Sequence, residues 1–324
     1  MIRVNNTKRN ISFIFGALAV GLAALLWSLD GVFIRPQFYR LPAGLVVFLE
    51  HTLGFLVLLP FLVRGKQDIL RMSPGTWGAL GWVCIWGGLL GTLFITKAFF
   101  AAYDPDVKTT LATVVILQKL QPVFALIMAR LILGERLRKD FYLWAILAIV
   151  AAYFLAFAKP GIRLADIRLI DPAAGYALLA AFAFGSSTVF GKRFTNAVSF
   201  ETATALRFGG TMILALIFIL LAGQFKAFPS IEAIHWKLLV LIVFTSGAMS
   251  MFIYYFGLKR IPASVATIFE LVFPLSAVML DYVIHKSILN ATQWIAAAIL
   301  LVCFFMIIRR KPVARTVREK DKRS

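Results

Sequence analysis

Two apolar runs decide the fold, and each carries a proline at the same distance from a polar side chain. The first run is TTLATVVILQKLQPVFALIMARLIL (109–133), and the second is ASVATIFELVFPLSAVMLDYVI (263–284). Gln118-x-x-x-Pro122 in the first corresponds to Glu270-x-x-x-Pro274 in the second. A helix of about 20 mostly apolar residues matches the thickness of the hydrocarbon core of a bilayer. The two runs therefore indicate a membrane-spanning chain built from related halves.

The composition of the whole chain agrees with a membrane protein. Of its 324 residues 61% are hydrophobic and 15% are charged, whereas soluble proteins have about 45–50% and about 25%. This excludes a disordered chain, a disulfide-rich scaffold and an ordinary cytosolic enzyme. Cys84 and Cys303 lie inside apolar runs and the three histidines are scattered, so neither a disulfide framework nor a metal site is predicted.

The chain contains ten apolar runs of membrane-spanning character, which predict an all-α integral membrane protein with ten transmembrane helices. No connection between the runs is long enough for a soluble catalytic domain. The runs are 11–34, 43–63, 76–101, 109–133, 141–158, 172–191, 201–222, 236–257, 263–284 and 291–308.

The basic residues of the connections predict the orientation of the chain. The N-terminus, the even-numbered connections and the C-terminus hold 21 Lys and Arg, against 8 in the odd-numbered connections. Because basic residues mark the cytoplasmic side, both termini are expected in the cytoplasm, including the basic tail 309–324. The net charge of +19 is thereby explained by the membrane surface, and no nucleic-acid partner is expected.

An internal repeat divides the chain into halves at 11–158 and 172–308. Leu26-Trp27-Ser28 followed by Arg35 matches Phe184-Gly185-Ser186 followed by Arg193. Each half has five predicted spans, and because five is odd the halves must have opposite orientations in the bilayer. Inverted repeats of this kind are typical of secondary transporters.

At this point the sequence resembles a known family, the EamA-type members of the drug/metabolite transporter superfamily. The resemblance rests on Trp27-Ser28, on the repeated span with a central proline, and on the stretch from Pro122-Val-Phe-Ala-Leu to Leu133-Gly134-Glu135-Arg136-Leu137. It implies a ten-span transporter of small metabolites, usually working outward, in a bacterial inner membrane. The chain departs from the family pattern at Lys286-Ser287, where Gly-Glu is usual, and at Glu50-His51, where a basic residue is commoner.

The two central prolines indicate where a substrate site would lie. A proline inside a helix removes the hydrogen bond to the carbonyl four residues earlier, here that of Gln118 or Glu270. Each half thus places a polar side chain and a carbonyl near mid-membrane, where lipid satisfies neither. We expect a substrate site at the repeat interface with Pro122 and Pro274 as hinges; the alternative is a structural kink satisfied by neighbouring helices.

Among the charged residues within the predicted spans, five are candidates for the site, namely Glu50, Lys97, Lys119, Arg207 and Glu270. If all five faced lipid they would cost roughly 12–17 kcal/mol, so they must pair, line a cavity or reach the interface. Charges of both signs suit a zwitterion, with its carboxylate at Lys97 or Lys119 and its ammonium at Glu50 or Glu270. The alternative is internal ion pairing, in which Arg207 would take part.

Trp27 and Tyr254 are candidates for an aromatic wall of the substrate site, although ordinary packing also explains them. A phosphate-binding loop of the Walker type is absent, so direct driving by ATP is not expected. The sequence therefore predicts a secondary transporter that works by alternating access and exports an amino acid or a similar zwitterion. The competing interpretation is a membrane-embedded enzyme or lipid-handling protein, but paired-carboxylate, metalloprotease and serine-nucleophile motifs are absent. An enzyme and a cofactor are not expected, and no oligomeric state is predicted.

Overall fold

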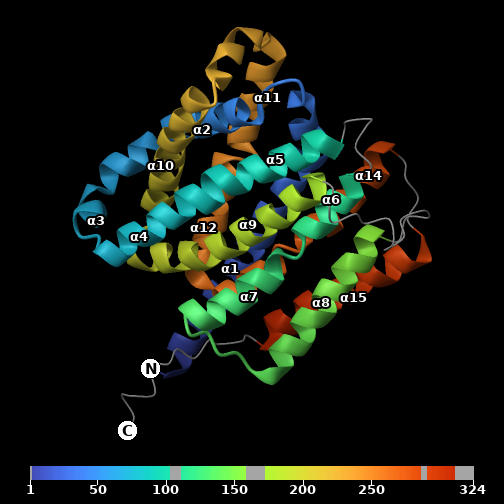
Figure 1. Ribbon diagram of the computed structural model, residues 1–324. Helices are drawn as coiled ribbons and strands as arrows, with labels where there is room; N and C mark the ends of the chain where they lie inside the picture. Colours follow the sequence, from blue (N-terminus) through green and yellow to red (C-terminus); the bar gives the residue numbers. More distant parts are fainter. Residues whose placement is uncertain (1, 103–110, 158–171, 286–289, 311–324) are drawn as a thin grey trace.

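A computed structural model of the protein describes residues 2–102, 111–157, 172–285 and 290–310. Positions 311–324 of the predicted basic tail lie outside the described residues. Within the described ranges the chain is entirely helical, as predicted (Figure 1). Seven helical segments are long and apolar enough to cross a bilayer, and shorter apolar helices accompany them. The seven are Asn10–Leu29, Ala43–Arg64, Pro74–Ala101, Pro172–Ala197, Phe200–Leu221, Ala233–Arg260 and Ala291–Arg309.

The five apolar runs of the first half fold into helices of which three are interrupted. The first run continues from α1 into a π-helical turn, the third contains a π-helical segment, and the fourth is divided in two. The elements are α1 (Ile2–Leu29), η1 (Asp30–Ile34), η2 (Arg35–Phe38), α2 (Ala43–Arg64), α3 (Lys66–Leu70), α4 (Pro74–Trp82), η3 (Val83–Leu90), α5 (Gly91–Ala102), α6 (Leu111–Gln118), α7 (Gln121–Ile132) and α8 (Lys139–Phe157). The π-helical segments widen the helix locally, as is frequent near functional sites.

The second half repeats the interruptions of the third and fourth runs, whereas its first run forms one continuous helix. Its third run is broken at Thr245–Gly247 and its fourth at Glu270–Leu271, the position equivalent to the break of the first half. The elements are α9 (Pro172–Ala197), α10 (Phe200–Leu221), η5 (Gln224–Ser230), α11 (Ala233–Phe244), α12 (Ala248–Arg260), α13 (Ala263–Phe269), α14 (Val272–His285) and α15 (Ala291–Arg310).

The two central prolines lie in the first turn of a second helix rather than deep inside one continuous helix. Pro122 is the second residue of α7 and Pro274 is the third residue of α14. A proline is tolerated in a first helical turn because the N–H that it lacks has no partner there. The expected kink is therefore a helix break in both halves. At the second break the carbonyl of Glu270 accepts from the N–H of Phe273 (3.1 Å), so the tight turn satisfies that acceptor.

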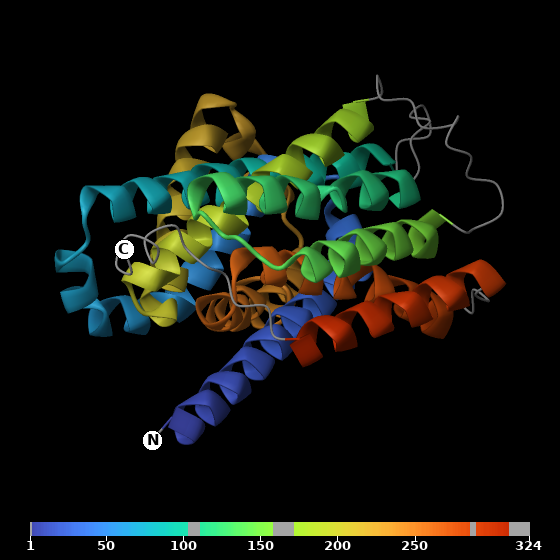
Figure 2. The same ribbon diagram turned by 90° about the horizontal axis from the view of Figure 1, so that it is seen from below.

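Contacts between the halves are reciprocal. In the first half α1 packs against α12 and α14, and in the second half α9 packs correspondingly against α5 and α7. Equivalent helices also meet each other directly, since α2 contacts α10 and α8 contacts α15. In addition, α7 of the first half contacts α13 of the second. Figures 1 and 2 show α8 and α15 side by side at one edge of the molecule. The first helix of each half therefore packs against equivalent helices of the other half.

Glycines of the third run allow the closest of these approaches. A Cβ at Gly87 would lie 2.0 Å from Ser187 Oγ, and one at Gly88 would lie 1.9 Å from Thr211 Oγ1. Both distances are far below van der Waals contact, so only glycine lets η3 lie this near α9 and α10. Small residues at helix interfaces serve this purpose in membrane proteins.

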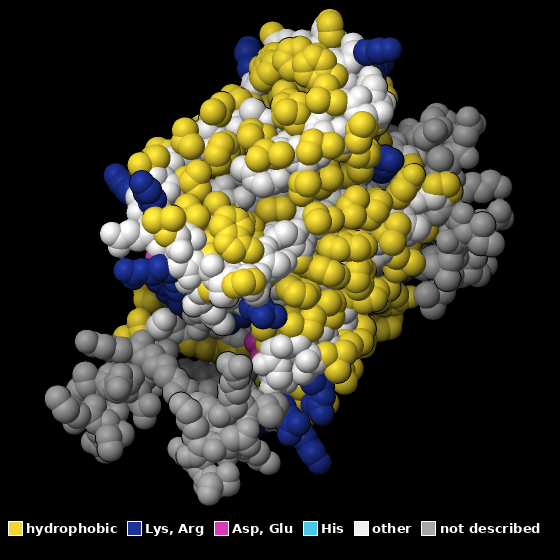
Figure 3. All heavy atoms as spheres, turned by 60° about the vertical axis from the view of Figure 1, so that its left-hand side comes forward, with side chains coloured by type: hydrophobic (Ala, Val, Ile, Leu, Met, Phe, Trp, Pro, Cys, Tyr) yellow, Lys and Arg dark blue, Asp and Glu magenta, His cyan; other side chains and the backbone are white. Residues whose placement is uncertain are grey.

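The outer surface is predominantly apolar. Figure 3 shows one face on which hydrophobic side chains cover the middle, while Lys and Arg lie mainly toward the borders. Large side chains such as Leu131, Leu221 and Trp294 are more than half exposed. In water such a surface would be unfavourable, but lipid tails are as apolar as these side chains.

Candidate functional site

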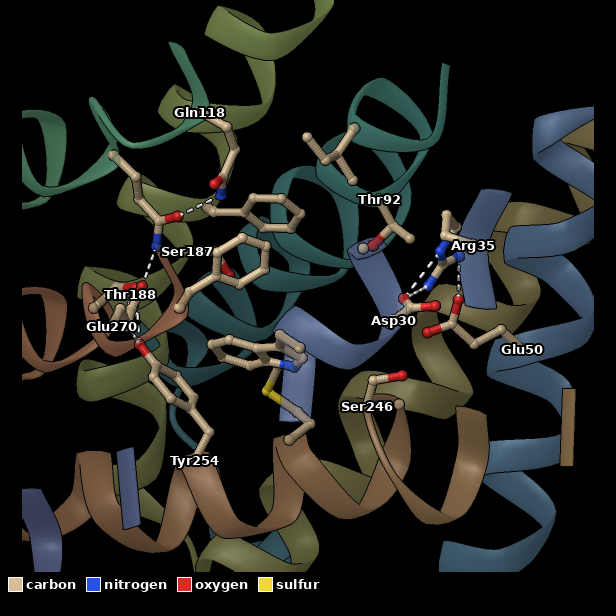
Figure 4. A pocket seen from close by; sticks show the side chains of 18 of the residues that line it. Asp30, Arg35, Glu50, Thr92, Gln118, Ser187, Thr188, Ser246, Tyr254 and Glu270 are labelled. Atoms are coloured by element: carbon tan, nitrogen blue, oxygen red, sulfur yellow. Dashed lines mark hydrogen bonds and ion pairs between the residues drawn. The ribbon is translucent and has the colours of Figure 1, made fainter. Parts of the chain in front are cut away.

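A cavity of about 160 Å³ lies where elements of the two halves meet, and its polar lining is shown in Figure 4. That space holds on the order of ten water molecules, which the polar lining would bind. Predicted site residues contribute much of the wall: Trp27, Glu50, Gln118, Lys119, Arg207, Tyr254 and Glu270 all line it. Sequence positions as far apart as 27 and 270 therefore face one cavity.

Glu270 is the centre of a hydrogen-bonded cluster at one end of the cavity. Its Oε1 accepts from the hydroxyl of Tyr254 (2.7 Å) and from Thr188 Oγ1 (3.3 Å). Its Oε2 accepts from the side-chain amide of Gln121, and the Gln121 oxygen accepts from Gln118 Nε2 (3.0 Å). The polar residues of the two related motifs, Gln118 and Glu270, are thus joined through Gln121.

The helix breaks place these side chains in the cavity. Gln118 ends α6 and Gln121 begins α7, while Glu270 directly follows α13. Interrupted helices expose backbone and side-chain polar groups together, an arrangement that binds substrates and ions in many transporters. Glu270 is 6% exposed, so a charge there depends on these donors.

Lys119 supplies a positive charge near the same end. Its Nζ lies 3.6 Å from the centroid of the Phe273 ring, and its charge interacts with that of Glu270. Within the described part of the chain its ammonium has neither a hydrogen bond nor an ion pair. A cation on an aromatic face remains available to a polar ligand group, because the ring does not neutralise it.

Aromatic side chains form the middle of the cavity. The Trp27 and Tyr254 rings are tilted against each other with centroids 5.2 Å apart, and Phe99, Phe184 and Phe273 also line the wall. Tyr254 combines an apolar face with a hydroxyl bonded to Glu270. Such a wall suits a flat, partly polar ring system.

At the other end of the cavity lies a buried ion-pair cluster of Asp30, Arg35 and Glu50. Arg35 donates to Asp30 Oδ2 through Nε (3.0 Å) and Nη2 (2.5 Å), and to Glu50 Oε2 through Nη1 (2.8 Å). All three residues are less than a tenth exposed. Glu50 therefore has an internal partner, one of the two alternatives considered from the sequence. Arg35 and Asp30 were not among the predicted site residues, although an acidic residue inside the run 11–34 was a signal for them.

Arg207 lines the cavity without an ion pair in the described structure. Its Nη1 donates to the Tyr255 hydroxyl (3.2 Å), and its guanidinium stays close enough to Glu50 for their charges to interact. Lys97 is not among the lining residues; its Nζ lies 5.4 Å from the Tyr176 ring centroid. Pro122 and Pro274 do not line the cavity either, and act only through the backbone that they shape.

A further contact between the halves involves Glu135, the acid of the Gly134-Glu135 pair. Its carboxylate accepts from the backbone N–H groups of Ala263 (2.9 Å) and Ser264 (3.0 Å), and from the Ser264 hydroxyl (2.6 Å). A first-half carboxylate thus caps α13 of the second half, where the exposed N–H groups attract negative charge. In the sequence, Glu135 was only part of the stretch that carries the family resemblance, and this capping role could not be predicted from it.

The described residues contain no group of three or more His, Cys, Asp or Glu side chains placed to hold a metal ion. The chemistry of the cavity is therefore that of hydrogen bonds, ion pairs and aromatic faces.

Comparison with known proteins gives matches along nearly the whole chain. Residues 14–157 and 172–309 each match the model of the EamA-like transporter family. The Riboflavin transporter ImpX of Fusobacterium nucleatum subsp. nucleatum is 40% identical over 290 residues, which cover 89% of this chain and 95% of the relative. Pseudopaline exporters of Pseudomonas aeruginosa are 27% identical over 146 residues, about half of either chain. A chain of known crystal structure superposes with a TM-score of 0.68 at 21% identity, covering 91% of this chain and 98% of that one, which shows a shared fold.

Proposed function

Because the chain belongs to the EamA-like transporter family of the drug/metabolite transporter superfamily, we propose that it carries riboflavin, or a molecule of the same chemistry, across a membrane. It is a member of a transporter family and not an enzyme, and its substrate is a small molecule. The observation that carries the proposal is the 40% identity to a riboflavin transporter over 95% of that relative.

The chemistry of the cavity supports a flavin. Riboflavin has a flat, three-ring aromatic system with a polar imide edge and a side chain of hydroxyl groups. Aromatic walls at Trp27 and Tyr254 suit the ring. The Glu270–Gln121–Gln118 cluster offers a carboxylate and amides to the imide edge.

The proposed mechanism is alternating access between two inverted halves of five spans each, with both termini in the cytoplasm and the protein in a bacterial inner membrane. Reciprocal contacts of α1 and α9, and helix breaks at equivalent positions, support the inverted arrangement. The Glu135 contact joins the first half to the start of α13. A movement that separates these two parts would have to break its three hydrogen bonds.

The test is counterflow in vesicles that contain the purified full-length protein. Vesicles loaded with unlabelled riboflavin should accumulate labelled riboflavin transiently, and protein-free vesicles should not. Glu270→Gln vesicles with equal protein content serve as the site control and should accumulate less. Absence of accumulation by the wild type at any riboflavin concentration would refute the proposal.

A second candidate is the export of an amino acid or a similar zwitterion. The observation that favours it is that charged groups of the cavity lack a direct ion-pair partner: Lys119 and Arg207 form no ion pair in the described residues, and Glu270 is bonded by neutral donors only. Loading the same vesicles with mixed amino acids discriminates the two. Counterflow of an amino acid, with none of riboflavin, would establish the second candidate.

A further inference from the structure

Four buried polar atoms without a hydrogen-bond partner belong to residues that line the same cavity. They are Asp30 Oδ1, Ser187 Oγ, Arg207 Nε and Ser246 Oγ. Their residues are 8%, 4%, 6% and 6% exposed. Buried polar groups in folded proteins are nearly always paired, and each unpaired one requires an explanation.

The four atoms fall into two pairs along the cavity, Ser187 with Arg207 and Asp30 with Ser246. Ser187 and Arg207 both lie next to Gly87, since a Cβ at Gly87 would lie 2.0 Å from Ser187 Oγ and 3.2 Å from Arg207 Nη2. In Figure 4, Asp30 and Ser246 lie beside the Arg35–Glu50 ion pair, on the side of the cavity away from Glu270 and Tyr254. Asp30 comes from the first half, and the other three come from the second half.

The local break between α11 and α12 explains the position of Ser246. The chain leaves the helix at Thr245 and re-enters it at Ala248, and the N–H of Gly247 donates back to the carbonyl of Ile242 (2.6 Å). The Ser246 carbonyl accepts from the Ser250 hydroxyl. The backbone is thereby held while the Ser246 hydroxyl stays directed to the cavity.

The unpaired atoms define the kind of ligand group that fits. Asp30 Oδ1 only accepts, Arg207 Nε only donates, and the two serine hydroxyls do both. A hydroxyl group also donates and accepts, so a row of hydroxyls can satisfy all four. Two carboxylates (Asp30 and Glu50) and two guanidiniums (Arg35 and Arg207) border this end, so their formal charges cancel. A neutral ligand is favoured over either ion, since each ion would meet like charge.

We propose that Asp30, Ser187, Arg207 and Ser246 form a subsite for a short chain of adjacent hydroxyl groups. This inference rests on the proposed function and extends it, because it assigns the hydroxylated side chain of riboflavin to this end. The aromatic ring then lies at Trp27 and Tyr254, with its imide edge toward Glu270. The two ends of the cavity thereby recognise the two ends of one substrate.

The experiment measures binding of two flavins to the purified full-length protein by the change in flavin fluorescence. Riboflavin carries the hydroxylated chain, whereas lumiflavin has the same ring with a methyl group in its place. The variants are Ser187→Ala and Ser246→Ala. The control is Thr267→Val, which removes a buried hydroxyl that is also unpaired but does not line the cavity.

Each serine variant should weaken riboflavin binding about 2- to 10-fold, the effect of one neutral hydrogen bond, and leave lumiflavin binding unchanged within about twofold. Because neither serine hydroxyl has a protein partner, the melting temperature without ligand should not fall. Thr267→Val should bind both flavins as the wild type does.

The outcomes separate the two proposals. If the serine variants weaken both flavins equally, or neither, the hydroxyl subsite is refuted while riboflavin transport stands. If wild-type protein binds both flavins with the same affinity, the subsite is refuted as well. If wild-type protein binds neither flavin, the proposed function is refuted, and the subsite assigned on its basis is refuted with it.

Discussion

Replacing Arg35 with methionine tests whether the buried ion-pair cluster holds the first two spans together. Methionine replaces the aliphatic part of the arginine side chain without its charge. The substitution therefore keeps part of the packing and removes both ion pairs, at 2.5 Å to Asp30 and 2.8 Å to Glu50. The two carboxylates would then face each other without a cation. Removing one partner of a buried ion pair costs about 3–5 kcal/mol.

The assay is thermal unfolding of the purified protein in one detergent, followed by the intrinsic tryptophan fluorescence. For a chain of this size 1 kcal/mol corresponds to roughly 2 °C, so the melting temperature of Arg35→Met should fall by about 6–10 °C. Arg130→Met is the matched control. Arg130 lies near the end of α7 and is exposed, so the same substitution there should change the melting temperature by less than about 2 °C.

A triple variant provides a second test of how the ion-pair cluster stabilises the fold. Asp30→Asn, Arg35→Met and Glu50→Gln together remove all three charges. The main cost of Arg35→Met is the burial of two carboxylates without their cation. The triple variant removes those two charges as well, so it should melt above Arg35→Met. If Arg35→Met melted within about 2 °C of the wild type, or if the triple variant melted below it, the cluster would not stabilise the fold in the way described.

Glu270→Gln should reduce riboflavin transport by at least about tenfold, because a charged hydrogen-bond acceptor is worth about 1.5–3 kcal/mol; the amount of protein inserted into membranes should be unchanged, and equal initial rates would remove this side chain from the site. Glu135→Ala leaves two N–H groups and a hydroxyl at the start of α13 without an acceptor. A loss of about 1–3 kcal/mol in unfolding free energy is expected, and an unaltered melting curve in detergent would contradict the capping role. Gly88→Ala should lower the yield of folded protein in size-exclusion chromatography, since the added Cβ would overlap Thr211. Gly78→Ala, where the nearest atoms lie beyond 4 Å, is the control, and an equal yield of the two would disprove the close packing of η3.

Much of the fold follows from the sequence because hydropathy acts locally. A run of about 20 apolar residues must form a helix in lipid, since only a helix satisfies every backbone hydrogen bond within one segment. The repeated Gln118–Pro122 and Glu270–Pro274 motifs also marked the two positions where helices are interrupted. The sequence could not show that the interruption is a full break with each proline in a first turn, because that depends on how the neighbouring helices hold the shortened segments.

The candidate site is formed by residues from distant parts of the sequence, and several of them could not be predicted. Gln121 and Thr188 are ordinary polar residues in an apolar sequence, and only their hydrogen bonds to Glu270 give them a role. The apolar run 11–34 ends just before Arg35, which places Arg35 in a connection. In the structure its Nη1 lies 2.8 Å from Oε2 of Glu50, fifteen positions away. Lys97 shows the opposite case: its charge within a span suggested the site, but the rotation of α5 directs it to Tyr176.

The sequence by itself determined that this protein is a membrane protein, that its two halves are related, and that charged groups within its spans must be kept away from lipid. Those conclusions depend on the free energy of transfer of each residue into lipid, a property of composition and spacing. Only the tertiary structure decided which charges pair, which line the cavity and which atoms remain unpaired. Such choices depend on the distances between side chains from different helices, because a hydrogen bond or ion pair forms only when its atoms come within about 3 Å.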